Sequence, residues 1–409
     1  NMEINAAVSD KFKSSNIEKV NVTTYGDQTV DMKNITGVET VTTKNSTGTL
    51  TLDNVANSTV GFGFEGNSTN SITANHVAGA LAGTNDILNV NLNAAKGVSL
   101  KVASGFESAK ITTTGTSDVT TLTAPGVTTY TVEGTGDVNF NGNLTNVTTL
   151  SATNNSGAIT TGTVVATTGF VGQAITAGAN GASVLLGAGN DNIGFTATAS
   201  KTSTVKLGAG DDKLLLKAAG VVAGATYVFG EAGNDTVKID STSAVLTVSD
   251  LIDGGEGTDT LVIDNAANDM VLRGIEKLTL TKNATGANVI NSADSAIAVT
   301  AEAGTGATAM AGLALTGLTS GSTVTINDAK DATGGIDTNT IIGFKSAEAA
   351  TTLDINSVVA NSIANDLEVT NVTNLTVDTA KDAVFNNTKL SGATDVTFKA
   401  AAQIETGVI

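Results

Sequence analysis

Short runs of alternating apolar and polar residues recur along the whole chain. Examples are Val20-Asn21-Val22-Thr23, Leu88-Asn89-Val90-Asn91-Leu92 and Leu375-Thr376-Val377. Alternation with a period of two is typical of a β-strand that buries one face. No stretch carries a convincing helical stripe, and residues 347–359 come nearest to one. The pattern therefore predicts an all-β protein.

A recurring sequence motif places these runs in repeats of similar length. A turn residue, an apolar residue and two polar residues precede a strand in Gly126-Val127-Thr128-Thr129-Tyr130 and again in Asn146-Val147-Thr148-Thr149-Leu150. Val127 and Val147 are 20 residues apart. Such a period, with one or two strands per unit, favours an elongated parallel β-solenoid or β-roll. A row of Thr/Val-rich β-sandwich domains is the alternative.

Composition narrows the function classes. The chain has 409 residues, of which 45 are glycine and one is proline, and 40% are hydrophobic, so it can bury a core rather than remain disordered. Its formal charge of −18 argues against nucleic acid or an anionic membrane as a partner. No apolar run is long enough to insert in a bilayer. With no cysteine and only His76, thiol chemistry, disulfides and two-His metal sites are excluded.

Four glycine-rich turns stand out between residues 185 and 262. They are Gly187-Ala188-Gly189-Asn190-Asp191, Gly208-Ala209-Gly210-Asp211-Asp212, Gly230-Glu231-Ala232-Gly233-Asn234-Asp235 and Gly254-Gly255-Glu256-Gly257-Thr258-Asp259. The fourth, continued by Thr260-Leu261-Val262, matches the nonapeptide G-G-x-G-x-D-x-U-x at every defined position. That repeat binds Ca²⁺ in parallel β-rolls.

The residue types in these turns suit a hard cation. Glycine permits positive φ, which lets successive carbonyl oxygens point to one spot. Aspartate adds an anionic oxygen, and Ca²⁺ prefers six to eight oxygen ligands, so stacked turns must share each ion. The predicted metal-site residues are Gly187, Gly189, Asn190, Asp191, Gly208, Gly210, Asp211, Asp212, Gly230, Gly233, Asn234, Asp235, Gly254, Gly255, Gly257 and Asp259.

The spacing of the aspartates predicts how the turns are arranged. Asp191, Asp212, Asp235 and Asp259 are separated by 21, 23 and 24 residues, whereas tandem nonapeptides would give nine. One motif turn per coil is therefore expected, all along one edge, with up to three Ca²⁺ ions in a single row. The affinity should be about 10⁻⁴–10⁻³ M. Degenerate copies near Asp86, Asp337 and residues 134–137 are more simply explained as ordinary turns.

The four turns resemble those of the RTX (repeats-in-toxin) family of secreted calcium-binding proteins. The Thr/Asn-rich remainder, as in residues 272–280, is similar to RTX-bearing surface-layer proteins of Gram-negative bacteria. The resemblance implies type I secretion, an extracellular place on the cell surface, and calcium-dependent self-assembly into a lattice. It also implies anchoring to lipopolysaccharide through a region outside this segment.

These observations predict three regions and a structural function. Residues 1–170 form a Thr/Asn-rich solenoid, residues 171–265 the RTX calcium-binding roll, and residues 266–409 a C-terminal solenoid. Since the chain begins Asn1-Met2 without a signal peptide, it is expected to be a piece of a larger protein. An RTX adhesin that binds glycans or receptors without forming a lattice is the alternative function. An enzyme is not expected, because candidate acid–base groups and aromatic sugar platforms are scarce.

Overall fold

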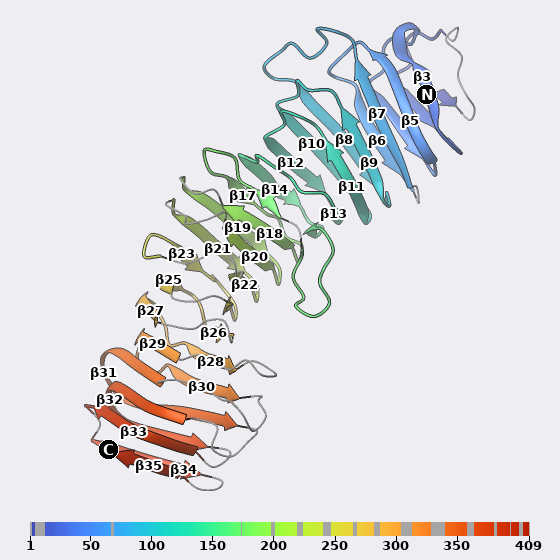
Figure 1. Ribbon diagram of the computed structural model, residues 1–409. Helices are drawn as coiled ribbons and strands as arrows, with labels where there is room; N and C mark the ends of the chain where they lie inside the picture. The colour runs from blue at the N-terminus through green and yellow to red at the C-terminus, as the bar shows by residue number, and fades with distance from the viewer. Residues whose placement is uncertain are drawn as a thin grey trace. The chain divides into compact units, whose positions relative to one another are not determined.

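The computed structural model describes residues 2–4, 13–66, 69–172, 174–197, 201–218, 224–239, 247–264, 268–281, 287–303, 313–328, 340–357, 364–379, 383–392, 394–400 and 404–408. The chain divides into two compact units (Figure 1). Unit 1 comprises Asn1–Thr198 and Ser203–Asp212, and unit 2 comprises Ala199–Thr202 and Lys213–Ile409. Throughout the described residues the regular structure is β-strand, apart from one short 3₁₀ helix in unit 1.

The strands of unit 1 are β1 (Met2–Ile4), β2 (Lys19–Val22), β3 (Gln28–Asp31), β4 (Thr40–Lys44), β5 (Thr47–Val55), β6 (Gly61–Glu65), β7 (Thr69–His76), β8 (Ile87–Asn93), β9 (Val98–Val102), β10 (Ser108–Thr114), β11 (Ser117–Thr123), β12 (Thr129–Gly134), β13 (Val138–Phe140), β14 (Thr149–Asn155), β15 (Ile159–Thr161), β16 (Ile175–Thr176), β17 (Ser183–Leu185), β18 (Asn192–Ala197) and β19 (Ser203–Ala209), with the 3₁₀ helix η1 at Met32–Asn34.

The strands of unit 2 are β20 (Lys213–Ala218), β21 (Thr226–Ala232), β22 (Thr236–Ile239), β23 (Leu251–Asp253), β24 (Thr260–Ile263), β25 (Asn268–Arg273), β26 (Lys277–Leu280), β27 (Ala287–Ser292), β28 (Ala298–Ala303), β29 (Leu313–Leu318), β30 (Thr323–Asp328), β31 (Thr340–Ser357), β32 (Ala364–Thr379), β33 (Ala383–Ser391), β34 (Asp395–Ala400) and β35 (Ile404–Val408).

Most strands of unit 1 pair in parallel with the strand two places along the chain, whereas β1 pairs with β2, β14 with β17 and β15 with β18. β8, β10 and β12 are successive neighbours in one sheet, and β9, β11 and β13 are neighbours in the other. The chain thus runs along one sheet, turns, returns along the other sheet and climbs one level. Ile87 pairs with Ser108 and Ser108 with Thr129, a rise of 21 residues per coil. The predicted all-β parallel solenoid is confirmed.

Unit 2 follows the same rule. β22 pairs in parallel with β20 and β24, and β23 pairs with β21 and β25. The long strand β31 contributes to both stacks, because its first residues pair with β29 and its last residues pair with β30. Residues 347–357, which carried the nearest thing to a helical pattern, therefore lie in a strand.

The core of each coil lies between its two sheets. In β8 the alternating residues Leu88, Val90 and Leu92 are buried, whereas Ile87 is 47% exposed. The register places Leu88 beside Ala109, which lies beside Tyr130 one level further on, so buried side chains form a continuous column. Burying each large aliphatic side chain contributes roughly 1.5–3 kcal/mol.

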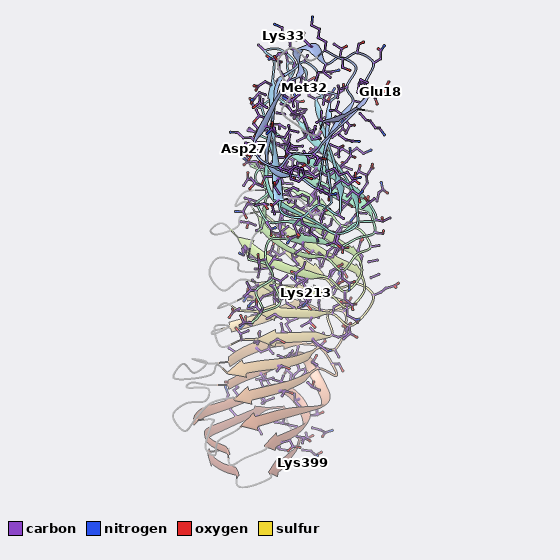
Figure 2. The ribbon with its side chains drawn as sticks, turned by 90° about the vertical axis from the view of Figure 1, so that its right-hand side faces the viewer. Glu18, Asp27, Met32, Lys33, Lys213 and Lys399 are labelled. Atoms are coloured by element: carbon purple, nitrogen blue, oxygen red, sulfur yellow. The ribbon has the colours of Figure 1, made fainter. Side chains whose placement is uncertain are left out.

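Two kinds of connection join the sheets of unit 1. One kind leads from the sheet that contains β8 to the sheet that contains β9, and the other leads back from β9 to β10. We call them the forward turns and the return corners. Charged side chains such as Glu18, Asp27 and Lys33 lie at the surface, whereas Met32 points inward (Figure 2). Among the described residues no helix has the length and apolarity needed to cross a membrane.

Candidate metal centre

The four glycine-rich turns occupy equivalent places in the coil. They follow β17, β19, β21 and β23 and lead into β18, β20, β22 and β24 respectively, so all four are forward turns. Thr236 after the third aspartate pairs with Thr260 after the fourth, which aligns these two turns on successive levels of unit 2. The arrangement agrees with one motif turn per coil, the consequence of the 21–24-residue spacing.

The sixth-position aspartates are buried and contact the next turn. Asp191, Asp212, Asp235 and Asp259 are each no more than 2% exposed. The backbone N–H of Asp191 donates to Oδ1 of Asp212 at 2.7 Å in unit 1, and that of Asp235 donates to Oδ1 of Asp259 at 2.7 Å in unit 2. In these two pairs of adjacent turns, a carboxylate accepts a backbone hydrogen bond from the level before.

The second carboxylate oxygens of Asp191 and Asp259 are different. Each Oδ2 is buried and has no hydrogen-bond partner among the described residues. Burial, together with the charges of Asp212 and Asp137, raises the pKa of Asp191 to about 8, although backbone hydrogen bonds from Ile159 and Gly187 act to lower it. Burial also raises the pKa of Asp259, and the charges of Glu276 and Asp253 add to the shift. A buried carboxylate oxygen without a partner is costly unless a cation or a proton neutralises it.

Asp250 provides a comparison within unit 2. It is also buried, with 7% exposure, but its carboxylate is fully used by the protein. Oδ1 accepts from the backbone N–H of Thr226 at 2.6 Å, and Oδ2 accepts from the backbone N–H and the hydroxyl of Thr247 at 2.8 and 2.9 Å. Burial of an aspartate in this fold does not by itself leave an oxygen unsatisfied. The unsatisfied oxygens of Asp191 and Asp259 are a property of the motif turns.

The glycines of the motif leave space beside oxygen atoms. A Cβ on Gly254 would overlap both the carbonyl oxygen of Gly274 and Oδ2 of Asp259. A Cβ on Gly230 would likewise overlap the carbonyl oxygen of Gly254. In unit 1, a Cβ on Gly210 would meet the carbonyl oxygen of Gly189. Glycine is required here because carbonyl and carboxylate oxygens approach the backbone closely.

Positive φ explains only some of the motif glycines. Counted back from each aspartate, the fourth position has a φ of +101° at Gly208 and +98° at Gly255, and the equivalent residue of the third turn is Glu231, with a φ of +73°. Gly187, at that position in the first turn, has no left-handed φ, and neither do Gly189, Gly230 and Gly254. The expectation that the motif glycines serve a left-handed backbone is therefore wrong for these four, which allow close approach of neighbouring backbone instead.

The oxygen atoms at these turns are of the chemical kind that Ca²⁺ binds. Within the described ranges no three Asp, Glu or His side chains converge as a metal-binding cluster, so a metal here would depend on backbone carbonyls as well as carboxylates. Carboxylate and carbonyl oxygens without nitrogen or sulfur ligands suit a hard cation such as Ca²⁺. Two of the three predicted ion positions would each lie between two turns of the same unit. One would lie between Asp191 and Asp212 in unit 1, and the other between Asp235 and Asp259 in unit 2.

The degenerate turns do not reproduce this arrangement. Asp86 lies in a return corner, where its Oδ2 accepts from the backbone N–H of Gly83 at 3.2 Å, as in an ordinary turn. Asp137 is exposed, and its Oδ1 accepts from the backbone N–H of Ala158 at 2.9 Å. Asp337 lies outside the described residues.

One forward turn without an aspartate shows what the sequence reasoning missed. The buried side-chain amide of Asn155 donates to the carbonyl oxygens of Gly157 at 2.6 Å and Gly136 at 3.3 Å, and its Oδ1 accepts from Thr113 Oγ1 at 2.9 Å. The amide nitrogen thus satisfies inward-facing carbonyl oxygens. Glu276 was also missed, although its Oε2 accepts from the backbone N–H of Asp259 at 2.8 Å.

No protein-family model, curated protein or solved structure matches this chain.

Proposed function

We propose that this protein is a calcium-stabilised structural solenoid that self-assembles into a surface layer on a bacterial cell. One observation carries the calcium part of the proposal. Asp191 in unit 1 and Asp259 in unit 2 each bury a carboxylate oxygen that no described protein group satisfies. The surface-layer part rests on the resemblance of the four turns and the Thr/Asn-rich remainder to secreted RTX proteins.

Bound Ca²⁺ would supply the positive charge that the paired turns lack. The ligands would be the carboxylates of Asp191 and Asp212 in unit 1 and of Asp235 and Asp259 in unit 2, with carbonyl oxygens of the motif glycines. These residues hold successive coils in register through the backbone-to-carboxylate hydrogen bonds. A cation that binds only the folded chain stabilises it by mass action.

Thermal unfolding with and without calcium tests the proposal. For a dissociation constant of about 10⁻⁴–10⁻³ M, 10 mM Ca²⁺ stabilises the fold by about 1.4–2.7 kcal/mol per ion. For units of this size that is roughly 3–10 °C in Tm per ion. Calorimetric scans in 10 mM CaCl₂ and in EGTA, at constant ionic strength, measure the difference. An unchanged Tm after chelation would contradict the proposed calcium binding.

Matched variants assign the effect to the motif. Asp191→Asn and Asp259→Asn keep an oxygen for the backbone hydrogen bond but remove the charge, so each should diminish the calcium-dependent rise in Tm. Asp27→Asn is the control, because Asp27 is exposed, lies outside the motif turns and makes a similar carboxylate-to-backbone hydrogen bond to Thr49 at 2.7 Å. Asp27→Asn should retain the full rise. An equal loss in all three variants would indicate non-specific charge screening.

Assembly is tested separately. Electron microscopy after addition of millimolar Ca²⁺ should show sheets or ordered oligomers. A calcium-stabilised chain that stays monomeric at high concentration would instead favour the alternative, an RTX adhesin that binds glycans or receptors without forming a lattice.

A further inference from the structure

The forward turn that follows the fourth motif turn lacks the motif but occupies the place of a fifth one. It joins β25 to β26 in unit 2. When the register of β23 with β25 and of β24 with β26 is continued into the turns, Gly274 is equivalent to Gly254 and Glu276 is equivalent to Asp259. This turn therefore keeps a glycine and an acid at the two ends, with the single residue Ile275 between them.

The Glu276 carboxylate makes the contact that the motif aspartates make. Its Oε2 accepts from the backbone N–H of Asp259 at 2.8 Å, and Oδ1 of Asp259 accepts from the backbone N–H of Asp235 at 2.7 Å. In both cases the acid of one level bonds to the backbone of the level before. The column of carboxylates in unit 2 therefore continues one level beyond the fourth motif turn.

The two oxygen atoms of Asp259 serve different levels. Oδ1 bonds to the preceding level, whereas Oδ2 lies beside the carbonyl oxygen of Gly274 on the following level. Both Oδ2 and this carbonyl oxygen lie within 2.6 Å of the point that a Cβ of Gly254 would occupy. They are thus separated by less than about twice 2.6 Å, a span that one Ca²⁺ ion bridges at its usual oxygen distances. Asp259 is 1% exposed, and its Oδ2 has no hydrogen-bond partner among the described residues.

The same arrangement occurs one level earlier in unit 2. A Cβ on Gly230 would overlap both Oδ2 of Asp235 and the carbonyl oxygen of Gly254. In unit 2, Oδ2 of each motif aspartate therefore belongs to the gap that follows its turn. The gap after Asp235 is the predicted ion position between the third and fourth turns. The gap after Asp259 is an additional one, which the spacing of the four motifs does not include.

Negative charge accumulates around this additional gap. After burial, the charges of Glu276 and Asp253 are the next causes that raise the pKa of Asp259. No ion pair joins Arg273 or Lys277 to these carboxylates in the part of the chain that the structure describes. A cation between the carboxylates would replace their mutual repulsion with attraction.

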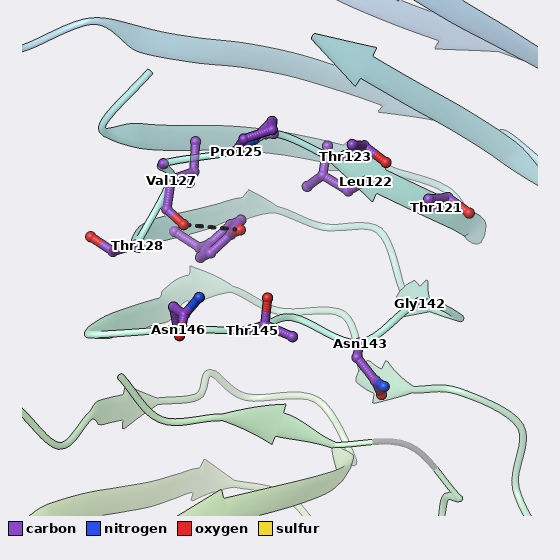
Figure 3. A pocket seen from close by; sticks show the side chains of 13 residues that line it. Thr121, Leu122, Thr123, Pro125, Val127, Thr128, Gly142, Asn143, Thr145 and Asn146 are labelled. Carbon is purple, nitrogen blue, oxygen red and sulfur yellow. Dashed lines mark hydrogen bonds between the residues drawn. The ribbon is translucent and has the colours of Figure 1, made fainter. Parts of the chain in front are cut away.

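A hollow elsewhere in the fold lacks these features. It has a volume of about 420 Å³ and lies among the return corners of unit 1, where it is lined by residues 121–128, 142–143 and 145–146 together with Tyr130 (Figure 3). No residue of this lining carries a carboxylate, and the Tyr130 hydroxyl is directed to the carbonyl oxygen of Val127. The hollow therefore offers no anionic oxygen to a hard cation, in contrast to the gap beside Asp259.

We propose that an additional Ca²⁺ ion binds between the fourth motif turn and the turn at residues 274–276. The ligands that the structure offers are Oδ2 of Asp259, the carbonyl oxygen of Gly274 and the Glu276 carboxylate, and water completes the shell. Glu276 is half-buried, so this ion is more open to solvent than one between two motif turns. The proposal rests on the calcium part of the proposed function and adds a position to the predicted row.

Calcium stoichiometry tests the site. Equilibrium dialysis of the full chain against ⁴⁵CaCl₂, up to millimolar concentration, counts the bound ions. Glu276→Gln keeps an oxygen for the N–H of Asp259 but removes the charge, so it should bind one ion fewer than the parent. Glu107→Gln is the matched control, because Glu107 Oε2 also accepts from the backbone N–H of an aspartate on an adjacent level, Asp86, at 2.7 Å. Glu107→Gln should bind as many ions as the parent.

A double variant separates the additional ion from its neighbour. Asp235→Asn should also bind one ion fewer, and Asp235→Asn combined with Glu276→Gln should bind two fewer. If the double variant loses only one ion, Glu276 belongs to the ion between the third and fourth turns, and the additional site does not exist.

Thermal unfolding distinguishes a ligand from a merely structural residue. In EGTA, Glu276→Gln should have a Tm at least equal to that of the parent, because one of the like charges near Asp259 is gone. In calcium its rise in Tm should be smaller than that of the parent and of Glu107→Gln. An equal fall in Tm with and without calcium would overturn the proposal in favour of a structural hydrogen bond. If the parent binds no calcium, the proposed function fails with this site; if the parent and Glu276→Gln bind equal numbers of ions, only this site is wrong.

Discussion

Glu231, in the third motif turn, has a backbone conformation that glycine adopts at the equivalent position of the second and fourth turns. Its φ is +73°, while the equivalent residues Gly208 and Gly255 have φ values of +101° and +98°. An L-residue in this left-handed region costs roughly 1–2 kcal/mol. Glycine avoids that cost but loses more entropy on folding, roughly 0.5–1 kcal/mol. Glu231→Gly should therefore stabilise unit 2 by about 1 kcal/mol, which is about 2–4 °C in Tm for a unit of this size.

The comparison that isolates the backbone is Glu231→Gly against Glu231→Ala. Both variants remove the carboxylate and its interactions, but only glycine relieves the left-handed strain. Calorimetric scans in EGTA and in calcium should place the glycine variant above the alanine variant by the same margin in both conditions. A glycine variant equal to or below the alanine variant would refute the reasoning.

The reverse change should have the opposite and larger effect. Gly255 has the same left-handed conformation, and a Cβ there would overlap the backbone of Glu231 on the neighbouring level. Gly255→Ala therefore adds a steric clash to the strain, and it should lower the stability of unit 2 by more than the 1–2 kcal/mol of strain alone. The magnitude of the loss separates close approach from backbone conformation as the reason for glycine at this position.

Three further outcomes are expected in unit 1. Leu88→Ala should cost about 2–5 kcal/mol because Leu88 is fully buried, while Ile87→Ala, at its exposed neighbour, should change stability by less than about 0.5 kcal/mol in urea unfolding. Asn155→Ala should lower the free energy of unfolding by about 2–4 kcal/mol, because the carbonyl oxygens of Gly136 and Gly157 lose their donor. The resulting fall in Tm should be the same with and without calcium, since an amide and not a metal satisfies these oxygens. Burial between Phe62 and Phe106 lowers the pKa of His76 below its usual 6.5, so the unfolded chain binds the proton more readily. Stability should therefore be full above pH 6.5 and should fall as the pH drops through the lowered pKa, and His76→Phe should remove that part of the pH dependence.

The strands and their period could be predicted because the sequence repeats the same local rule. Leu88, Val90 and Leu92 alternate with polar residues, and all three are buried. The 20-residue interval between Val127 and Val147 matches the register, in which Thr129 pairs with Thr149. In a solenoid each coil contacts only its neighbours, so local pattern and global fold coincide.

An antiparallel hairpin at residues 162–172, in which Val164 pairs with Val171, could not be predicted in the same way. Its Thr, Val, Ala and Gly residues have the composition of the surrounding strands and corners. Only the register shows that these residues are additional to the coil, since Thr160 pairs with Asn192 on the next level. The unsatisfied oxygens of Asp191 and Asp259 depend in turn on what the neighbouring coil places beside each carboxylate. A single turn's sequence does not contain that information.

The alignment of the four motifs illustrates a related limit. If the motifs are aligned on their first glycine, the equivalent residues are Gly187, Gly208, Gly230 and Gly254. If they are aligned on the aspartate, Gly208, Glu231 and Gly255 become equivalent, and these three share a left-handed backbone conformation. The aspartate sets the register because it bonds to the adjacent level. The first glycine of each turn has to admit an oxygen atom from that level, and of these four glycines Gly208 alone also has a left-handed φ.

The forward turns satisfy buried oxygens in two different ways, and the difference locates where calcium can act. At Asn155 an amide donates to the carbonyl oxygens of Gly136 and Gly157, so that level is complete without a metal. At Asp191, on the next level of the same unit, the side chain is an acceptor only and adds negative charge next to that of Asp212. An amide can satisfy carbonyl oxygens by itself, but a carboxylate has no donor to offer them, and a buried carboxylate oxygen that accepts no hydrogen bond requires a cation or a proton. Unit 2 has its own such pair in Asp235 and Asp259, so removal of calcium by chelation should destabilise each unit through its own turns. The stability contributed by the Asn155 turn should not depend on calcium.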